Sequence, residues 1–321
     1  MITQGLTDLQ VNGYAGIDFN DAALTPEALD HALAAMLGAN VTTCLPTLIT
    51  AGIQTLQARL LALDHAVATS RLGPAMVPGF HLEGPFLNPT LGYAGCHPPD
   101  AMIPPDPAIL DRLTANLRRP VILLTIAPEQ TGAAGLIRYA RAKGMIVAMG
   151  HTAATTIPDG IALSTHLGNA LPQPQPKFLN PLMAQLADDR LDASFIADGI
   201  HIPRHALKVM LRTKTAARSV LVTDATAAAA APPGFYPFAG MTIQRTEDGS
   251  VRLPGTSTLA GSALALDQAV RNIAAWGLAD AATAIAMAST HPNTLLARHG
   301  IVVPTRPVTW THDLYPAKPP G

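Results

Sequence analysis

Eight short apolar runs alternate with longer stretches rich in Ala and Leu along most of this 321-residue chain. The longer stretches carry helical spacing, as at Leu29 and Leu33 after the capping signal Thr25-Pro26-Glu27. Such alternation predicts parallel strands joined by crossover helices, and eight units predict an α/β fold, a (β/α)8 barrel of the TIM type. The expected strands are residues 7–11, 41–45, 76–82, 121–127, 146–150, 164–167, 193–196 and 220–223.

The pattern changes after the eighth run. Residues 241–245 and 251–253, separated by Glu247-Asp248-Gly249, predict a β-hairpin inserted before three final helices at 264–276, 281–289 and 292–298. We therefore expect one barrel domain over residues 1–300, with no separate small domain. The tail, residues 301–321, is rich in proline and is expected to be irregular.

Charge and composition exclude several classes of partner. The chain has 21 Lys and Arg against 22 Asp and Glu, a net charge of −1, so neither nucleic acid nor an anionic membrane surface is an expected partner. The N-terminal segment has no basic start followed by an apolar run, which predicts a cytoplasmic location. The two cysteines, Cys44 and Cys96, are expected to be free thiols, and Cys44 to lie in the core.

Four titratable side chains stand where apolar runs end: Glu83, His151, His166 and Asp224. The carboxyl ends of all strands meet at one face of a parallel barrel, so these side chains are expected to converge. Glu83, His151 and His166 form the O/N/N donor set that catalytic zinc prefers, which leaves a fourth position for water. Asp224 is then the natural base for hydrolysis of a carbonyl compound.

Each of these residues taken alone is more typical of a hydrogen-bonded structural group than of a ligand. Their joint occurrence at four strand ends favours a metal-dependent hydrolase. His81 precedes Glu83 by two residues and therefore points to the same side of the strand. It either orients Glu83 or fills the barrel interior, and a supporting role is favoured.

Ordered motifs then point to a family. They include Asp8-Leu9-Gln10-Val11-Asn12-Gly13, His81-Leu82-Glu83-Gly84-Pro85-Phe86, Thr165-His166-Leu167-Gly168-Asn169-Ala170, Ile196-Ala197-Asp198-Gly199-Ile200-His201, Leu221-Val222-Thr223-Asp224-Ala225-Thr226 and Leu259-Ala260-Gly261-Ser262. From Asp8 to about Arg298, the chain resembles the N-acetylglucosamine-6-phosphate deacetylases of the amidohydrolase superfamily. The resemblance implies hydrolysis of the N-acetyl group of N-acetylglucosamine 6-phosphate, or of a close N-acetylhexosamine phosphate, to acetate and the amino sugar phosphate.

The resemblance also implies roles for individual residues. Glu83, His151 and His166 would hold the metal, Asp224 would be the catalytic acid and base, and His97 would polarise the acetyl carbonyl. An oxyanion donor of this kind lowers the activation barrier by about 3 kcal/mol. The sugar phosphate would contact Cys96, His97, Asn169, Ala170, Lys177, His201, Leu259, Ala260 and Gly261.

Gln10 and Asn12 bear on the number of metals. Superfamily members with two metals usually offer His-x-His at this strand, whereas a neutral amide is a poor zinc ligand. We therefore expect one divalent metal per subunit, with zinc as the expected ion, although iron, cobalt and manganese accept the same donors. By resemblance alone, the chain is expected to be a homodimer that takes a small-molecule substrate.

The sequence departs from the family pattern at three points. The family's small β-sandwich has no counterpart in this sequence, Lys177 stands at the position of the phosphate-binding Arg, and Ala94 stands at the position of another basic residue. The two replacements motivate an alternative function, hydrolysis of an N-acyl amine or cyclic amide that lacks phosphate. The missing small domain motivates a third, a non-catalytic barrel that binds a sugar phosphate.

Overall fold

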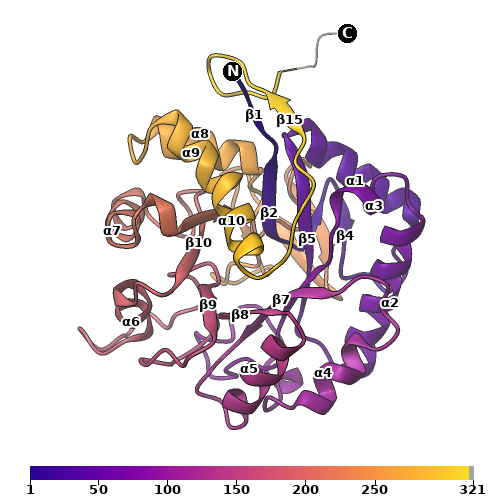
Figure 1. The fold of residues 1–321 in the computed structure, drawn as a ribbon, viewed down its shortest axis with the longest axis vertical. Helices are drawn as coiled ribbons and strands as arrows, with labels where there is room; N and C mark the ends of the chain where they lie inside the picture. Colours follow the sequence, from indigo (N-terminus) through magenta and orange to yellow (C-terminus); the bar gives the residue numbers. More distant parts are fainter. Residues whose placement is uncertain (318–321) are drawn as a thin grey trace.

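The computed structural model describes residues 1–317 and consists of a parallel barrel surrounded by helices (Figure 1). Neighbouring strands follow the order of the chain and all pair in parallel. This confirms the predicted α/β barrel. The eight strands are β2 (Leu6–Val11), β5 (Val41–Ile49), β6 (Phe80–Glu83), β7 (Val121–Ile126), β8 (Ile146–Met149), β9 (Ile161–Ser164), β10 (Asp192–Ile196) and β11 (Ser219–Val222).

Hydrogen bonds just beyond the last strand close the barrel. The Asp224 amide donates to the Gln10 carbonyl over 2.9 Å, and the Asn12 amide donates to the Ala225 carbonyl over 2.7 Å. The buried carboxylate of Asp8 accepts from the Thr223 hydroxyl over 2.6 Å and from the Thr223 amide over 3.2 Å. The first and last strands are therefore joined directly at the carboxyl-terminal end of the barrel.

Two strands differ in position from the prediction. The third strand is Phe80–Glu83 rather than 76–82, because Gly73–Met76 forms the short helix α3 and Pro78-Gly79 precedes the strand. The sixth is Ile161–Ser164 rather than 164–167, because His166 has a φ of 31° and leaves the extended conformation. The run predicted at 76–82 contains most of the third strand, whereas the run predicted at 164–167 shares only Ser164 with the sixth strand and otherwise forms the turn after it.

The helices pack their apolar faces on the strands. In α1 (Pro26–Gly38) the Thr25 side chain accepts from the Ala28 amide and Leu29, Leu33 and Met36 are buried, as the capping signal predicts. Within the described residues, no helix has the length and apolarity to cross a membrane. The remaining helices are α2 (Ile53–Thr69), α4 (Pro107–Thr114), α5 (Ala133–Ala142), α6 (Pro181–Ala187), α7 (Arg204–Lys214), α8 (Leu266–Ala275), α9 (Ala281–Ala288) and α10 (Thr290–Arg298), with short 3₁₀ turns at Pro99–Ala101 and Ala216–Arg218.

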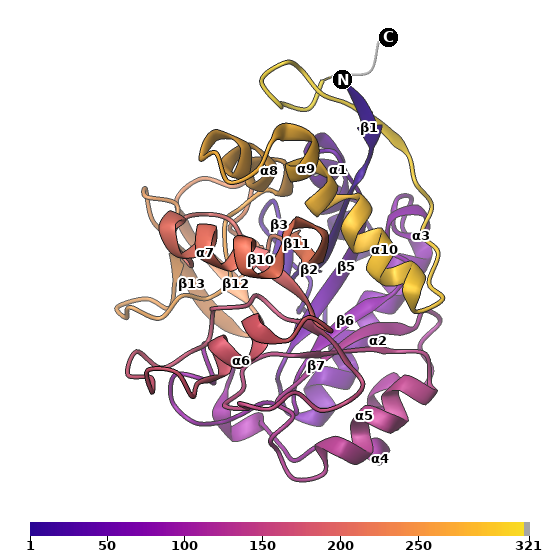
Figure 2. The same ribbon diagram turned by 60° about the vertical axis from the view of Figure 1, so that its left-hand side comes forward.

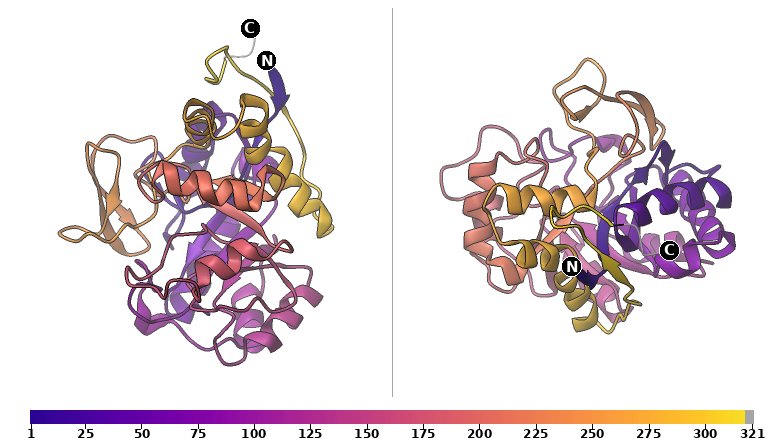
Figure 3. Two further views of the ribbon diagram at one scale, coloured as in Figure 1. Left: turned by 90° about the vertical axis from the view of Figure 1, so that its left-hand side faces the viewer. Right: turned by 90° about the horizontal axis from the view of Figure 1, so that it is seen from above.

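The insertion after β11 has three strands rather than two. β12 (Gly234–Phe238), β13 (Met241–Arg245) and β14 (Val251–Arg252) pair antiparallel and form a meander beside the barrel (Figures 2 and 3). Phe238, Ile243 and Val251 are buried in a small core under this sheet, which also contains Ile49 of β5. The meander is thus anchored to the strand end that borders the site.

Both chain ends also pair, which the sequence did not indicate. β1 (Ile2–Gln4) pairs antiparallel with β15 (Pro307–Thr309) in the tail that was expected to be irregular (Figure 1). The buried indole of Trp310 donates from Nε1 to the Thr3 hydroxyl over 2.8 Å. A further two-stranded ladder, β3 (Gly13–Tyr14) with β4 (Ile17–Asp18), follows β2.

Candidate active site

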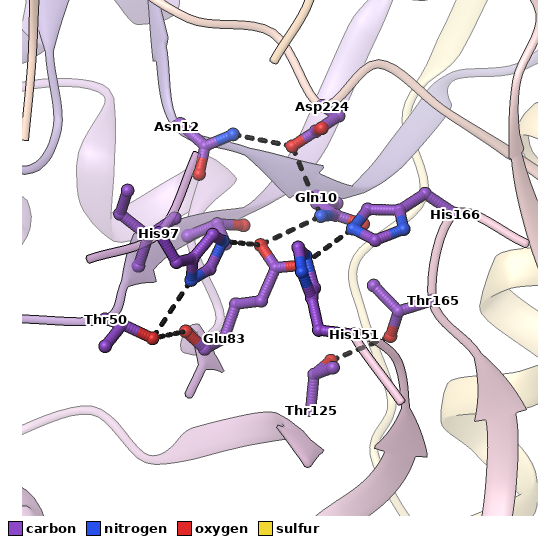
Figure 4. A network of polar contacts seen from close by, with 12 residues as sticks. Gln10, Asn12, Thr50, Glu83, His97, Thr125, His151, Thr165, His166 and Asp224 are labelled. Atoms are coloured by element: carbon purple, nitrogen blue, oxygen red, sulfur yellow. Dashed lines mark hydrogen bonds and ion pairs between the residues drawn. The ribbon is translucent and has the colours of Figure 1, made fainter. Parts of the chain in front are cut away.

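The structure brings together the four side chains expected at the strand ends (Figure 4). Glu83 is the last residue of β6, while His151, His166 and Asp224 each lie two residues beyond a strand, after β8, β9 and β11. These last three have φ values of 50°, 31° and 49°, in the left-handed region that non-glycine residues rarely adopt. Such backbone strain concentrates where a side chain must be aimed, and here it turns all three toward one point.

The Glu83 carboxylate is the centre of this cluster. Its Oε1 lies 2.8 Å from His166 Nε2 and 3.3 Å from His151 Nε2, and its Oε2 lies 3.9 Å from His97 Nε2. Burial by itself raises the pKa of Glu83, but the charge of His166 and the hydrogen bonds from His151 and His166 hold it well below its usual range. Glu83 is therefore an anion facing three imidazoles.

The hydrogen bonds of His151 indicate what this arrangement accommodates. His151 Nδ1 donates to the Tyr93 carbonyl over 2.7 Å, so Nε2 either carries a second proton that it donates to Glu83 or carries a lone pair directed at Glu83. A lone pair and a carboxylate oxygen 3.3 Å apart repel unless a proton or a cation lies between them. A buried carboxylate with neutral imidazoles is a donor set for a divalent metal, so these residues fit one.

More imidazoles surround Glu83 than the expected pair. Within residues 1–317, the donor atoms of Glu83, His97 and His151 all lie within 4.8 Å of one another, and His166 is not in that group. His166 nevertheless has the imidazole nitrogen nearest to Glu83. The structure therefore offers four candidate donors in place of the three expected.

The surroundings of His97 keep its imidazole ring neutral. Burial and the nearby His151 lower the pKa of His97 to about 3, so its ring is neutral near pH 7. Its Nδ1 lies 3.0 Å from the Thr50 hydroxyl, which is also 3.4 Å from the Glu83 carbonyl oxygen. If the hydroxyl donates to its nearer neighbour, Nδ1, then Nε2 carries the ring proton.

Asp224 is connected to Glu83 through an amide. Gln10 Nε2 donates to Glu83 Oε2 over 3.1 Å and to Asp224 Oδ1 over 3.2 Å, and Asn12 Nδ2 donates to the same Asp224 oxygen over 2.7 Å. Burial and the negative charge of Glu83 raise the pKa of Asp224 to about 6. An acid with a pKa near neutrality can both accept and return a proton.

His81 lies deeper in the barrel. Its ring nitrogens contact the hydroxyls of Thr47 at 3.3 Å and Thr125 at 2.8 Å, and no described residue links it to the Glu83 carboxylate by a hydrogen bond. Burial lowers the pKa of His81 to about 4, so the ring is neutral. Of the two roles considered for His81, these contacts favour filling of the barrel interior.

A cavity of about 570 Å³ opens above the cluster, a size typical of small-molecule sites. Six of the expected substrate contacts line it: Cys96, His97, Asn169, Ala170, Leu259 and Gly261.

Three other expected contacts do not line this cavity. Ala260 is fully buried in the core beneath the meander. His201 is buried beside Asp198, with 2.6 Å between Nδ1 and Asp198 Oδ2. Lys177 is exposed on the loop before α6.

Several lining residues were not assigned a substrate contact from the sequence. Asn12 stands two residues after Gln10 and thus follows the same side of the strand, a signal that could have found it. Phe238, Ser257 and Thr258 come from the meander and the loop after it. No periodic pattern marks them, because irregular loops carry none.

Comparisons with known proteins agree with this geometry. No family model matches the chain. The chain is 34% identical over 307 residues to an N-acetylgalactosamine-6-phosphate deacetylase of Escherichia coli O157:H7, covering 94% of this chain and 79% of that protein. It is 31% identical over 291 residues to an N-acetylglucosamine-6-phosphate deacetylase of Caenorhabditis elegans, covering 85% and 68%.

A solved structure is similar over nearly the whole chain. It is a mutant N-acetyl-D-glucosamine-6-phosphate deacetylase from Mycobacterium smegmatis in complex with N-acetyl-D-glucosamine-6-phosphate. The TM-score is 0.87 at 29% sequence identity, and the match covers 98% of this chain and 84% of the other. The barrel and its insertion thus follow a known architecture.

Proposed function

The chain belongs to the N-acetylglucosamine-6-phosphate deacetylase family of the amidohydrolase superfamily, and on this premise we propose that it hydrolyses the N-acetyl group of an N-acetylhexosamine 6-phosphate. The products are acetate and the amino sugar phosphate. The observation that carries the proposal is the convergence of Glu83, three imidazoles and Asp224 at the base of one cavity. One relative is named for N-acetylgalactosamine 6-phosphate and another for N-acetylglucosamine 6-phosphate, so these two epimers are the first substrates to compare.

Glu83, His151 and His166 would hold one divalent metal, which we propose to be zinc. Bound there, a divalent metal lowers the pKa of water and polarises a carbonyl oxygen. Gln10 supports a single ion, because its amide donates to Glu83 and Asp224 and is thereby committed to both carboxylates.

The chain's own side chains would carry the proton and position the acetyl group. Asp224 accepts a proton from the attacking water and returns it to the nitrogen that leaves as amine. His97 Nε2, protonated when Thr50 donates to Nδ1, donates to the acetyl oxygen as negative charge develops on it. Asn169, Ala170, Leu259 and Gly261 line the cavity and would surround the sugar.

The phosphate would be met by Lys177 of a second copy of the chain in a homodimer. Lys177 is exposed, and its neighbours Phe178 and Leu179 are 79% and 73% exposed, as is Leu91 at 91% on the cavity wall. Large exposed apolar side chains on loops that border a cavity are typical of an association surface. Free Cys44 and Cys96 and a phosphorylated substrate support a cytoplasmic location.

The test is acetate release by the purified protein from both N-acetylhexosamine 6-phosphates and from unphosphorylated N-acetylglucosamine, with metal content measured on the same sample. We expect release confined to the phosphate esters, about one metal per chain, and loss of activity on chelation that zinc restores. Equal turnover of the unphosphorylated sugar would instead favour the amidohydrolase without a phosphate requirement. The comparison with the unphosphorylated sugar is included because Lys177 is exposed and lies outside the cavity.

A further inference from the structure

The Asn12 side chain lies beside Asp224, and both residues line the cavity. Asn12 is 1% exposed and lines the cavity wall. Its Nδ2 donates to Asp224 Oδ1 over 2.7 Å, and Figure 4 shows its oxygen directed away from that carboxylate. This bond fixes the orientation of the amide, because the flipped amide would set two oxygens against each other.

The other end of this amide has no hydrogen-bond donor among the described residues. Asn12 Oδ1 is buried, and none of residues 1–317 donates a hydrogen bond to it. A buried carbonyl oxygen without a donor costs free energy, so such an atom at a cavity wall is suited to a donor that arrives with the ligand. A ligand that offers an N–H or O–H group at this point would satisfy the oxygen.

One carboxylate oxygen of Asp224, Oδ2, accepts no hydrogen bond from the described residues. Both hydrogen bonds that reach the carboxylate from described residues, from Gln10 and Asn12, end on Oδ1. Oδ2 is therefore the oxygen that can exchange a proton with a substrate. Asn12 and Asp224 are hydrogen-bonded to each other and line the same cavity, so a substrate nitrogen placed between them would face both side chains.

We propose that Asn12 Oδ1 accepts the N–H of the scissile acetamido group and makes Asn12 a residue that selects amides over esters. The inference rests on the proposed function. In the reaction the carbonyl carbon gains a bond to the water oxygen, the C–N bond breaks, and one water proton passes through Asp224 to the nitrogen. The N–H that Asn12 holds is retained throughout, which leaves the nitrogen lone pair free to take the proton from Asp224.

The test compares binding of two ligands in the Asp224→Asn background, where the proton transfer is removed. The ligands are N-acetylglucosamine 6-phosphate and its counterpart 2-O-acetylglucose 6-phosphate, in which an ester oxygen replaces the amide N–H. Their dissociation constants are measured by calorimetry on the zinc-loaded protein. We expect Asn12→Ala to weaken binding of the amide by about tenfold and that of the ester by less than about twofold.

Asn12→Asp is the matched control, because it keeps an acceptor oxygen and replaces the Nδ2 donor with a second oxygen that shares a negative charge. The preference for the amide should be retained or increased, since a carboxylate is the stronger acceptor. Equal losses for both ligands in Asn12→Ala, or a lost preference in Asn12→Asp, would overturn the proposal. If Asn12→Ala does not fold, Asn12→Asp alone decides. Acetate release by the wild type tests the proposed function separately.

Discussion

At the residue scale, two buried carboxyl groups that accept hydrogen bonds from the same side-chain amide have pKa values shifted in opposite directions. Gln10 donates to both Glu83 and Asp224, yet the imidazoles around Glu83 keep the pKa of that group low, while burial and the charge of Glu83 raise the pKa of Asp224 to about 6. Environments that separate the pKa values of neighbouring carboxyls assign them different tasks. Here Glu83 is suited to hold a cation and Asp224 to carry a proton.

Removing the titratable group of Asp224 should abolish turnover while leaving the metal in place. We expect Asp224→Asn to lower kcat by about 10²- to 10⁴-fold, because an amide cannot accept the water proton and return it. The measurement is acetate release, with metal content determined on both proteins. An Asp224→Asn protein with unchanged metal content and full turnover would rule out the role of Asp224.

The Asp198–His201 pair should contribute stability that depends on pH. Burial by itself raises the pKa of Asp198, but the hydrogen bond and charge of His201, with two backbone amides, hold the pKa below its usual value of 3.8. A carboxyl with a lowered folded-state pKa stabilises the protein above its unfolded-state pKa, and this is lost as the pH falls through the folded-state value.

Denaturant unfolding of metal-free protein at about pH 5 and about pH 3 tests this expectation. The wild type should lose more free energy of unfolding over that interval than Asp198→Asn, which keeps the acceptor for the backbone amides but does not ionise. Parallel losses in the two proteins would show that Asp198 contributes nothing to the acid sensitivity.

At the element scale, the loop before α8 is fastened to the end of β11. The Ser262 amide donates to the Asp224 carbonyl over 2.8 Å, and the Ser262 hydroxyl donates to the Thr223 carbonyl over 2.6 Å. Gly261 permits this approach, since a Cβ there would lie 2.5 Å from Thr226 Cγ2 and 2.8 Å from the Asp224 carbonyl oxygen. The cavity wall and the strained Asp224 turn are therefore one packed unit.

Gly261→Ala should disrupt this unit. Gly261 has a φ of 61°, so alanine there adds a steric clash to a backbone conformation it disfavours. We expect a loss of more than about 2 kcal/mol in the free energy of unfolding and a lower kcat. Gly277→Ala is the matched control, because Gly277 has a φ of 63° but nothing within 4 Å of its added Cβ. Equal effects at the two sites would show that backbone strain alone accounts for the loss.

At the scale of the whole molecule, the barrel brings distant segments to one face. The cavity wall combines Asn12 after β2, the loop after β6, the loop after β9 and the segment that follows the meander. The exposed Leu91, Phe178 and Leu179 lie on two of these loops. In the proposed homodimer, a two-fold symmetric contact through these loops would bring the partner's Lys177 to this face, because each copy uses the same surface.

Mixing the Lys177→Ala and Asp224→Asn proteins tests whether Lys177 contributes to the active site of the partner subunit. If Lys177 acts in the partner's site, a hybrid of Lys177→Ala with Asp224→Asn contains one site with both functional residues. Activity on the 6-phosphate should then rise above the average of the two parents after subunit exchange. Activity that stays at that average, in samples shown by light scattering to be dimeric, would place Lys177 outside the partner's site.

Much of this architecture could be predicted from the sequence because its signals are local. The capping signal at Thr25 and the apolar face of α1 act within one helix, and seven of the eight apolar runs cover most of a barrel strand, while the run at 164–167 meets its strand only at Ser164. The positions of Glu83, His151, His166 and Asp224 at strand ends follow from the same pattern, since parallel strands end on one face. The pairing of β1 with β15 could not be predicted, because it joins segments about 300 residues apart with no distinctive composition.

The amino-acid sequence by itself determined the eight strands, their order and the residue types at the mouth of the barrel, because strand length, helix period and caps are properties of neighbouring residues. Only the tertiary structure decided how those residues are used. It placed Gln10 between two carboxylates, left Asn12 Oδ1 without a donor among the described residues and set Lys177 outside the cavity. These depend on distances and burial among segments far apart in the chain, which no local pattern encodes.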